Sequence, residues 1–201
     1  MKIPRGGRIY TKVTAYHEAR HALVLLHEGR QVREISISVD GHGGGFCRSA
    51  VKKKNPYDVL RNQRSAKAAW INTLESTYAD IRIALAGPLA EAKILGKPLR
   101  ALGSESDFDS CIYQVERLTR LGSFMAEYIE VTPPNPEQIF EAEKRRTRRW
   151  LARSEVWSAV SLVSYVLFHK GKLSGPVLNN VIGAASALRG QRPLEFGLRR
   201  A

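Results

Sequence analysis

The sequence predicts a mainly α protein, an array of about six helices with a small two- to three-stranded β ribbon. Apolar residues recur at helical spacing over most of the chain, which is typical of amphipathic helices. Strict alternation of apolar and polar residues occurs in one short stretch, residues 32–39, just before a glycine-rich segment. The 201 residues are 43% hydrophobic and 25% charged, which is typical of a globular protein and excludes disorder over most of the length.

The first predicted element is a helix over residues 11–28. Its apolar residues lie three and four positions apart, so they share one face of the helix. Thr11 or Thr14 can cap the start, because a hydroxyl oxygen there can accept a backbone N–H. Gly29 can end the helix, because glycine readily adopts the left-handed conformation that often follows a last turn.

A β ribbon is predicted next. Residues 32–39 alternate in polarity, as expected for a half-buried strand. The residues on its buried face are Ile35, Ile37 and Val39. The glycine-rich stretch 40–45 forms the turn, and residues 45–51 form the return strand.

Two helices are predicted in the middle of the chain. Residues 65–95 show a long helical pattern, which Gly87 and Pro88 are expected to kink or divide. A loop over residues 103–107 follows. Ser106 then caps a second helix, whose apolar residues again recur at helical spacing.

The proline-rich segment 132–136 separates the last part of the chain from the rest. Three further helical patterns follow it, over about residues 137–152, 155–170 and 174–188. We therefore expect one domain over residues 11–188, with a C-terminal helical part that begins near residue 137. Residues 1–10 are expected to form an N-terminal tail and residues 189–201 a basic C-terminal tail.

The charge balance points to an anionic partner. Thirty-two Lys and Arg residues against 19 Asp and Glu residues leave a net charge of +13. A dense basic run at residues 144–149 fits either a solvated helix face or a nucleic-acid patch, but no nucleic-acid-binding motif accompanies it. The two cysteines, Cys47 and Cys111, are too few for a disulfide framework and favour a reducing compartment.

No segment predicts a membrane span or a signal peptide. The longest apolar run, residues 156–168, is interrupted by serines and is shorter than the roughly 20 residues that a spanning helix needs. The basic N-terminus has no apolar stretch behind it. We therefore expect a cytoplasmic protein without a membrane span.

Residues 17–21, His-Glu-Ala-Arg-His, form an HExxH motif that can carry chemistry. Two histidines four apart project from one helix face, so both imidazoles can bind one metal ion. Glu18 can then accept a proton from a water on that ion, whose pKa zinc lowers to about 7. Catalytic zinc normally has three protein ligands, so a further ligand elsewhere is expected. The alternative is a pair of helix histidines beside a solvated glutamate.

Three stretches, in order, resemble one protein family. Residues 14–24, Thr-Ala-Tyr-His-Glu-Ala-Arg-His-Ala-Leu-Val, resemble the zinc helix of the FtsH-type proteases, which are ATPase-linked zinc metallopeptidases. Residues 85–96 resemble the family's Ala-Gly-Arg-x-Ala-Glu-Glu helix, and residues 103–108 resemble its Gly-Ala-x-Asn-Asp-Leu element. Residues 172–177 are similar to its C-terminal helical hairpin. The resemblance implies a fold like the FtsH protease domain.

The same resemblance implies a Zn²⁺ site and assigns its residues. The implied zinc ligands are His17, His21 and Asp107. Glu18 is the implied general base. Asp109 lies about 200° round the helix from Asp107, so we expect it to face elsewhere. Glu91 matches an acidic position of the family, and we expect it either to orient one histidine or to be a surface charge.

A substrate strand is also implied. The family's β ribbon receives substrate as an added strand, and the corresponding residues are Gly44, Gly45 and Phe46.

The sequence departs from the family pattern at three positions. Arg20 replaces a glycine and either points away from the site or crowds it, and Pro88 and Ala92 replace an Arg and a Glu. The chain has no Gly-x-x-x-x-Gly-Lys-Ser/Thr loop, so we expect a stand-alone peptidase domain.

The sequence therefore predicts a zinc metalloendopeptidase that cleaves unfolded polypeptides through zinc-activated water without ATP. A separate ATPase and a second copy of the chain are further candidate partners. Two other functions stay open: a non-catalytic, zinc-stabilised interaction module, and a basic accessory protein that binds nucleic acid. The first would have a filled or metal-free site, and the second would gather its basic residues on one face.

Overall fold

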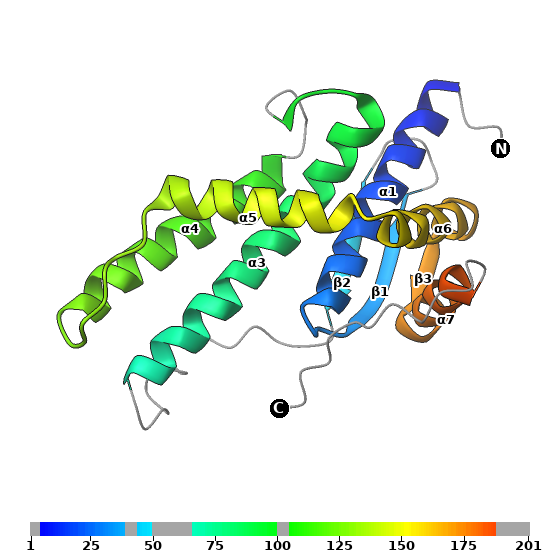
Figure 1. The fold of residues 1–201 in the computed structure, drawn as a ribbon. Helices are drawn as coiled ribbons and strands as arrows, with labels where there is room; N and C mark the ends of the chain where they lie inside the picture. The colour runs from blue at the N-terminus through cyan, green and yellow to red at the C-terminus, as the bar shows by residue number, and fades with distance from the viewer. Residues whose placement is uncertain (1–4, 39–43, 50–65, 100–104, 188–201) are drawn as a thin grey trace.

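The computed structural model describes residues 5–38, 44–49, 66–99 and 105–187. In these residues the chain forms six helices and one three-stranded antiparallel sheet, which confirms the mainly α class (Figure 1). Within the same residues no helix is both long enough and apolar enough to span a membrane.

Helix α1 (Arg5–His27) carries the HExxH motif. It begins at Arg5 rather than at Thr11, so part of the predicted N-terminal tail is helical. It ends as predicted, because Gly29 has a φ of 72° and the N–H of Arg30 donates to the carbonyl of Leu25 at 2.9 Å. That bond satisfies one of the free carbonyls of the last turn.

The sheet has the order β2–β1–β3, with β1 (Val32–Ile37) in the centre. Strand β2 (Gly45–Ser49) is the predicted return strand, and β3 (Lys172–Ser174) comes from the far end of the chain. The buried face of β1 differs from the prediction at Val32, which is 7% exposed. The register shifts between Val32 and Glu34, and such a bulge turns Val32 to the buried face against strict alternation. Val39 and most of the turn lie outside the described residues.

Two long helices flank α1 on one side (Figure 1). Helix α3 (Ala66–Leu95) packs against α1, and α4 (Glu105–Ala126) packs against the other side of α3. Helix α3 contains Pro88 in its interior and is not divided there. The residues from 84 to 90 are all buried, and this packing compensates for the backbone donor that a proline lacks. Ser106 lies inside the first turn of α4, so the predicted cap was wrong.

Three more helices complete the fold. Asn135 caps α5 (Pro136–Leu151), and its side chain accepts the N–H of Gln138 at 3.0 Å. Helix α6 (Ser154–Lys170) packs against α1, and α7 (Gly175–Ala187) packs against α6. Figure 1 shows α5 crossing in front of α3 before the chain turns into α6.

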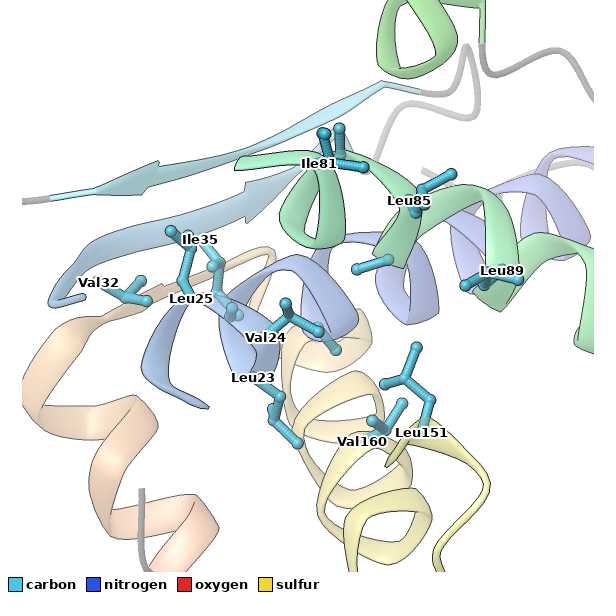
Figure 2. Close-up of a cluster of buried hydrophobic side chains, with 14 of the residues drawn as sticks. Leu23, Val24, Leu25, Val32, Ile35, Ile81, Leu85, Leu89, Leu151 and Val160 are labelled. Carbon is cyan, nitrogen blue, oxygen red and sulfur yellow. The ribbon is translucent and has the colours of Figure 1, made fainter. Parts of the chain in front are cut away.

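The core holds α1 between α3, α6 and the sheet. Figure 2 shows its side chains converging from α1, β1, α3, α5 and α6; those labelled are Leu23, Val24, Leu25, Val32, Ile35, Ile81, Leu85, Leu89, Leu151 and Val160. Leu23, Ile35, Ile81 and Leu85 are fully buried. Each such side chain contributes about 1.5–3 kcal/mol to the free energy of unfolding. The helix that carries the histidines is therefore packed closely against α3.

A buried ion cluster ties α3 to two of its neighbours. The Nε and Nη2 atoms of Arg82 each donate to Glu28 at 2.6 Å, and its Nη1 donates to Glu143 at 2.5 Å. Burial lowers the pKa of Arg82, but the bonds to the two glutamates outweigh burial and raise it above the usual value. This arginine is thus fully paired inside the protein.

Candidate metal centre and substrate cleft

Three side chains from two helices meet at one point. His17 and His21 lie one turn apart on α1, and Asp107 lies in the first turn of α4. Asp107 Oδ2 is 2.8 Å from His17 Nε2 and 3.3 Å from His21 Nε2, and the two Nε2 atoms are 2.9 Å apart. Asp109 is exposed and does not belong to this group. The fold therefore joins residues that are 86 positions apart in the sequence.

The second nitrogen of each imidazole ring has an oxygen partner. His17 Nδ1 lies 2.8 Å from Glu91 Oε1, and His21 Nδ1 lies 2.7 Å from the carbonyl oxygen of Ile83. Because both oxygens accept, Nδ1 is the donor in each ring, and in a neutral ring Nε2 then presents a lone pair. With both rings neutral, two lone pairs and a carboxylate face one another, which is an arrangement that a proton or a metal ion satisfies. Glu91 is therefore in hydrogen-bond contact with one of the two histidines, and its orienting role stays a prediction.

Gly87 on α3 makes room for the two histidines. A Cβ atom at this position would lie 2.3 Å from His17 Nε2 and 2.5 Å from His21 Nε2, far inside van der Waals contact. Any side chain here would displace both rings. From the sequence, Gly87 was expected only to help kink or divide the helix, and its role beside the histidines was missed. Its place in the stretch that resembles the Ala-Gly helix, residues 85–96, was the available signal.

The electrostatics of the cluster favour positive charge at its centre. Burial lowers the pKa of His17, but hydrogen bonds to Asp107 and Glu91 outweigh burial and raise it to about 10. Burial raises the pKa of Asp107, but its hydrogen bonds to both histidines outweigh burial and hold it well below its usual value. The surroundings thus stabilise a carboxylate beside a cation.

The donor set also fits a divalent metal ion. All three ligand atoms lie within 4.8 Å of one another, with separations of 2.8–3.3 Å. Ligands about 2.1 Å from a tetrahedral zinc ion lie about 3.4 Å apart, so small shifts would complete the geometry. Two imidazoles and a carboxylate, with oxygen partners behind the imidazoles, are a suitable donor set for zinc.

The cluster opens into a cleft of about 600 Å³. Residues of α1, α3 and α4 line it together with Gly44, Gly45 and Phe46. Glu18 lies in the cleft and is 5% exposed. Burial raises the pKa of Glu18, while the charges of His21 and His17 oppose that rise. A Cβ on Gly45 would lie 2.8 Å from Glu18 Oε1, so glycine permits the close approach of β2.

About half of the chain matches ATP-dependent zinc metalloproteases named FtsH. The protein of Veillonella parvula is 33% identical over 101 residues, which is 49% of this chain and 13% of the relative. The proteins of Mycoplasma genitalium and Mycoplasma pneumoniae are each 35% identical over 99 residues, which is 48% of this chain and 12% of each relative. This chain carries an FtsH-related zinc metalloprotease segment. No family model matches the chain.

Arg20, which stands where the family has a glycine, does not crowd the cleft. Arg20 is 2% exposed and does not line the cleft. Its guanidinium carbon lies 4.4 Å from the centre of the Trp157 ring on α6. Burial lowers the pKa of Arg20 to about 10, so the group stays protonated at neutral pH. Of the two expectations for Arg20, the structure supports the one in which it points away.

Strand β2 lies at the edge of the sheet, beside the cleft. It pairs with β1 on one side only, and within the described residues no strand pairs with its other side. Gly44 and Gly45 are exposed, and Phe46 is 38% exposed. The residues predicted as the substrate strand thus combine exposure with proximity to Glu18.

One ion pair in the cleft was not expected from the sequence. Arg30 donates to Asp80 at 2.5 Å, and both residues line the cleft. No local motif marks either residue, because they come from different elements that only packing brings together.

The basic run at 144–149 lies on α5, with four exposed arginines and with Lys144 paired to Glu141.

Proposed function

We propose that the FtsH-related chain is a zinc-dependent endopeptidase. The observation that supports this most strongly is the convergence of two imidazole nitrogens and one carboxylate beside a buried glutamate. In this proposal His17, His21 and Asp107 hold the zinc ion. When bound, zinc supplies a Lewis acid that polarises the scissile carbonyl and makes water nucleophilic near neutral pH. The relatives in the comparison are named as zinc metalloproteases.

Glu18 moves the proton in this mechanism. Its carboxylate accepts a proton from the attacking water as the C–O bond forms, and then passes that proton to the leaving amine nitrogen as the peptide C–N bond breaks. Burial raises the pKa of the Glu18 carboxyl group. A higher pKa makes the carboxylate a better acceptor for the proton of the attacking water.

Glu91 and the carbonyl of Ile83 orient the two imidazoles. Each accepts a hydrogen bond from Nδ1, so each Nε2 faces Asp107. Such outer partners fix both the tautomer and the direction of a metal-binding histidine. Gly87 leaves the space in which the rings are held.

The substrate in this proposal is an unfolded polypeptide. The free edge of β2 at Gly44, Gly45 and Phe46 can pair with an extended segment through backbone hydrogen bonds. Pairing of this kind needs free backbone donors and acceptors along an extended segment, and most backbone groups of a stable folded domain are already paired. The isolated chain is therefore expected to cleave casein without ATP and to leave stable folded domains intact. A separate ATPase that unfolds substrates is the partner that we would test for.

Zinc analysis and a casein cleavage assay on matched variants test the proposal. Wild-type protein should carry about one zinc ion per chain and lose activity in chelator. Glu18→Gln should keep its zinc and fold but lose about 10²–10⁴-fold in rate, because an amide cannot accept the proton. The exposed Glu127→Gln is the control and should be as active as wild type.

Two results would contradict this function. An unchanged cleavage rate in Glu18→Gln would rule out the mechanism, whatever the metal content. Bound zinc with no cleavage of casein, even when ATPases from a lysate are added, would favour the non-catalytic module.

A further inference from the structure

A second cavity, of about 280 Å³, lies between α1, α3 and the end of α5. It shares no lining residue with the metal cleft. Its polar lining consists of three cationic side chains, Arg20, Lys93 and Arg148, and no acidic residue lines it. Its apolar lining is Leu89, Ala92, Leu151 and Ala152. Figure 2 shows Leu89 on α3 and Leu151 at the end of α5.

Arg20 is the most deeply buried of the three cations. It is 2% exposed, and its Nε is buried with no hydrogen-bond partner. The Trp157 ring lies 4.4 Å from the guanidinium carbon and 3.7 Å from the Lys93 ammonium nitrogen. The face of an aromatic ring offsets only part of the desolvation of a buried cation. Two like charges therefore share one aromatic ring.

The same fold pairs its other buried arginine completely. Arg82 donates to two carboxylates, those of Glu28 and Glu143. Within the described residues no carboxylate lies in salt-bridge distance of Arg20. Burial and the nearby Arg20 also lower the pKa of Lys93, as expected for neighbouring like charges. A buried, unpaired guanidinium that lines a cationic cavity indicates a ligand of opposite charge.

We propose that this cavity binds a phosphate-type dianion, either free phosphate or a small phosphate monoester. A phosphate group carries about −1.5 to −2 charges at neutral pH, which matches several cations better than a single carboxylate does. Guanidinium groups also match its oxygen atoms in a two-pronged geometry. The apolar floor at Leu89, Ala92 and Leu151 leaves space for the organic part of an ester.

Binding of this anion would couple α1 to α3 next to the metal cluster. Arg20 directly precedes His21, and Lys93 lies two residues after Glu91. An anion that contacts both cations joins the two helices at the level of the histidines. The inference does not depend on the proposed protease activity, because the cavity is separate from the cleft and its binding can be measured without turnover.

Thermal unfolding at constant ionic strength tests the inference. Inorganic phosphate at ten times its Kd should raise the unfolding midpoint by about 3–5 °C above that in chloride or acetate, because only a ligand of the folded state stabilises it. Arg148→Met should weaken phosphate binding about tenfold or more, because it removes a lining cation. Arg145→Met, an exposed arginine of the same helix outside the cavity, should bind phosphate as wild type does.

Arg20→Met should abolish the difference between phosphate and chloride. Titration with glycerol 3-phosphate distinguishes the two sources of the anion, since tighter binding than inorganic phosphate indicates an ester and equal or weaker binding indicates free phosphate. Equal midpoints in phosphate and chloride for wild-type protein would overturn the inference. Equal losses of phosphate binding in Arg148→Met and Arg145→Met would also overturn it, because they would indicate general screening of a basic surface.

Discussion

On one face of α1, His17 and His21 direct two imidazole nitrogens toward the carboxylate of Asp107. On the adjacent face, Arg20 directs a guanidinium toward Trp157 and a cavity lined by two further cations. The first region concentrates electron pairs and negative charge, and the second concentrates positive charge. Both lie at the contact between α1 and α3. Polar groups that the protein itself does not match show where a ligand of opposite charge can bind.

The Arg82 cluster shows what a purely structural charged group looks like in the same fold. Arg82 is 8% exposed and is bonded to Glu28 and Glu143, so its charge is matched within the chain. A buried pair of this kind adds little net stability but is costly to break. The contrast between Arg82 and Arg20 separates a structural arginine from a ligand-binding one.

The largest expected effect is on the metal side. Asp107→Ala should reduce bound zinc from about one ion per chain to almost none, because catalytic zinc needs three protein ligands. Zinc content after exhaustive dialysis measures this. Asp109→Ala, two positions away and exposed, is the control and should keep its zinc. The reverse result would show that Asp109 and not Asp107 is the ligand.

The next largest effect is expected on the free energy of unfolding when Arg82, the paired arginine, is replaced. Arg82→Met should lower the free energy of unfolding by about 2–4 kcal/mol, because it leaves the buried Glu143 and the partly buried Glu28 without their cation. Urea unfolding of wild type and variant measures the change. A loss below about 1 kcal/mol would show that the cluster is solvated enough to tolerate the unpaired glutamates.

A smaller effect on zinc affinity is expected from Glu91, which accepts a hydrogen bond from His17. Glu91→Gln should weaken zinc binding about 10–100-fold, because the amide accepts the hydrogen bond of His17 Nδ1 without the negative charge that raises the basicity of the ring. Competition with a chelator of known affinity measures the change. Unaltered affinity would indicate that Glu91 serves only as a surface charge.

The smallest effect is expected on the free energy of unfolding when Arg20, the arginine without a carboxylate partner, is replaced. In buffer without phosphate, Arg20→Met should change the free energy of unfolding by less than about 1 kcal/mol in either direction, because the lost cation–π contact is offset by the removal of a buried charge. Urea unfolding beside Arg82→Met makes the comparison direct. A loss as large as that of Arg82→Met would show that Arg20 is structural and would remove the contrast between the two regions.

Local rules were enough for most helices. The helical spacing of apolar residues predicted α3, α5, α6 and α7 to within about two residues, which is the usual uncertainty of helix ends. The same rules failed at Val32, because a bulge depends on the partner strand, and at the start of α1, which continues back to Arg5. Pro88 did not divide α3, because packing on both sides of a proline can hold a helix that local propensity would end.

The sequence by itself determined that His17 and His21 share a helix face with Glu18 beside them, because an α-helix repeats every 3.6 residues. It also supplied Asp107 and Glu91 as partners through family resemblance. Only the tertiary structure decided which atoms meet: Glu91 with His17 Nδ1, the Ile83 carbonyl with His21, and the space that Gly87 leaves for both rings. The tertiary structure also decided that Arg20 points toward Trp157 and not into the metal cleft. Such contacts join segments far apart in the chain, and their geometry depends on how whole helices pack, which no local pattern specifies.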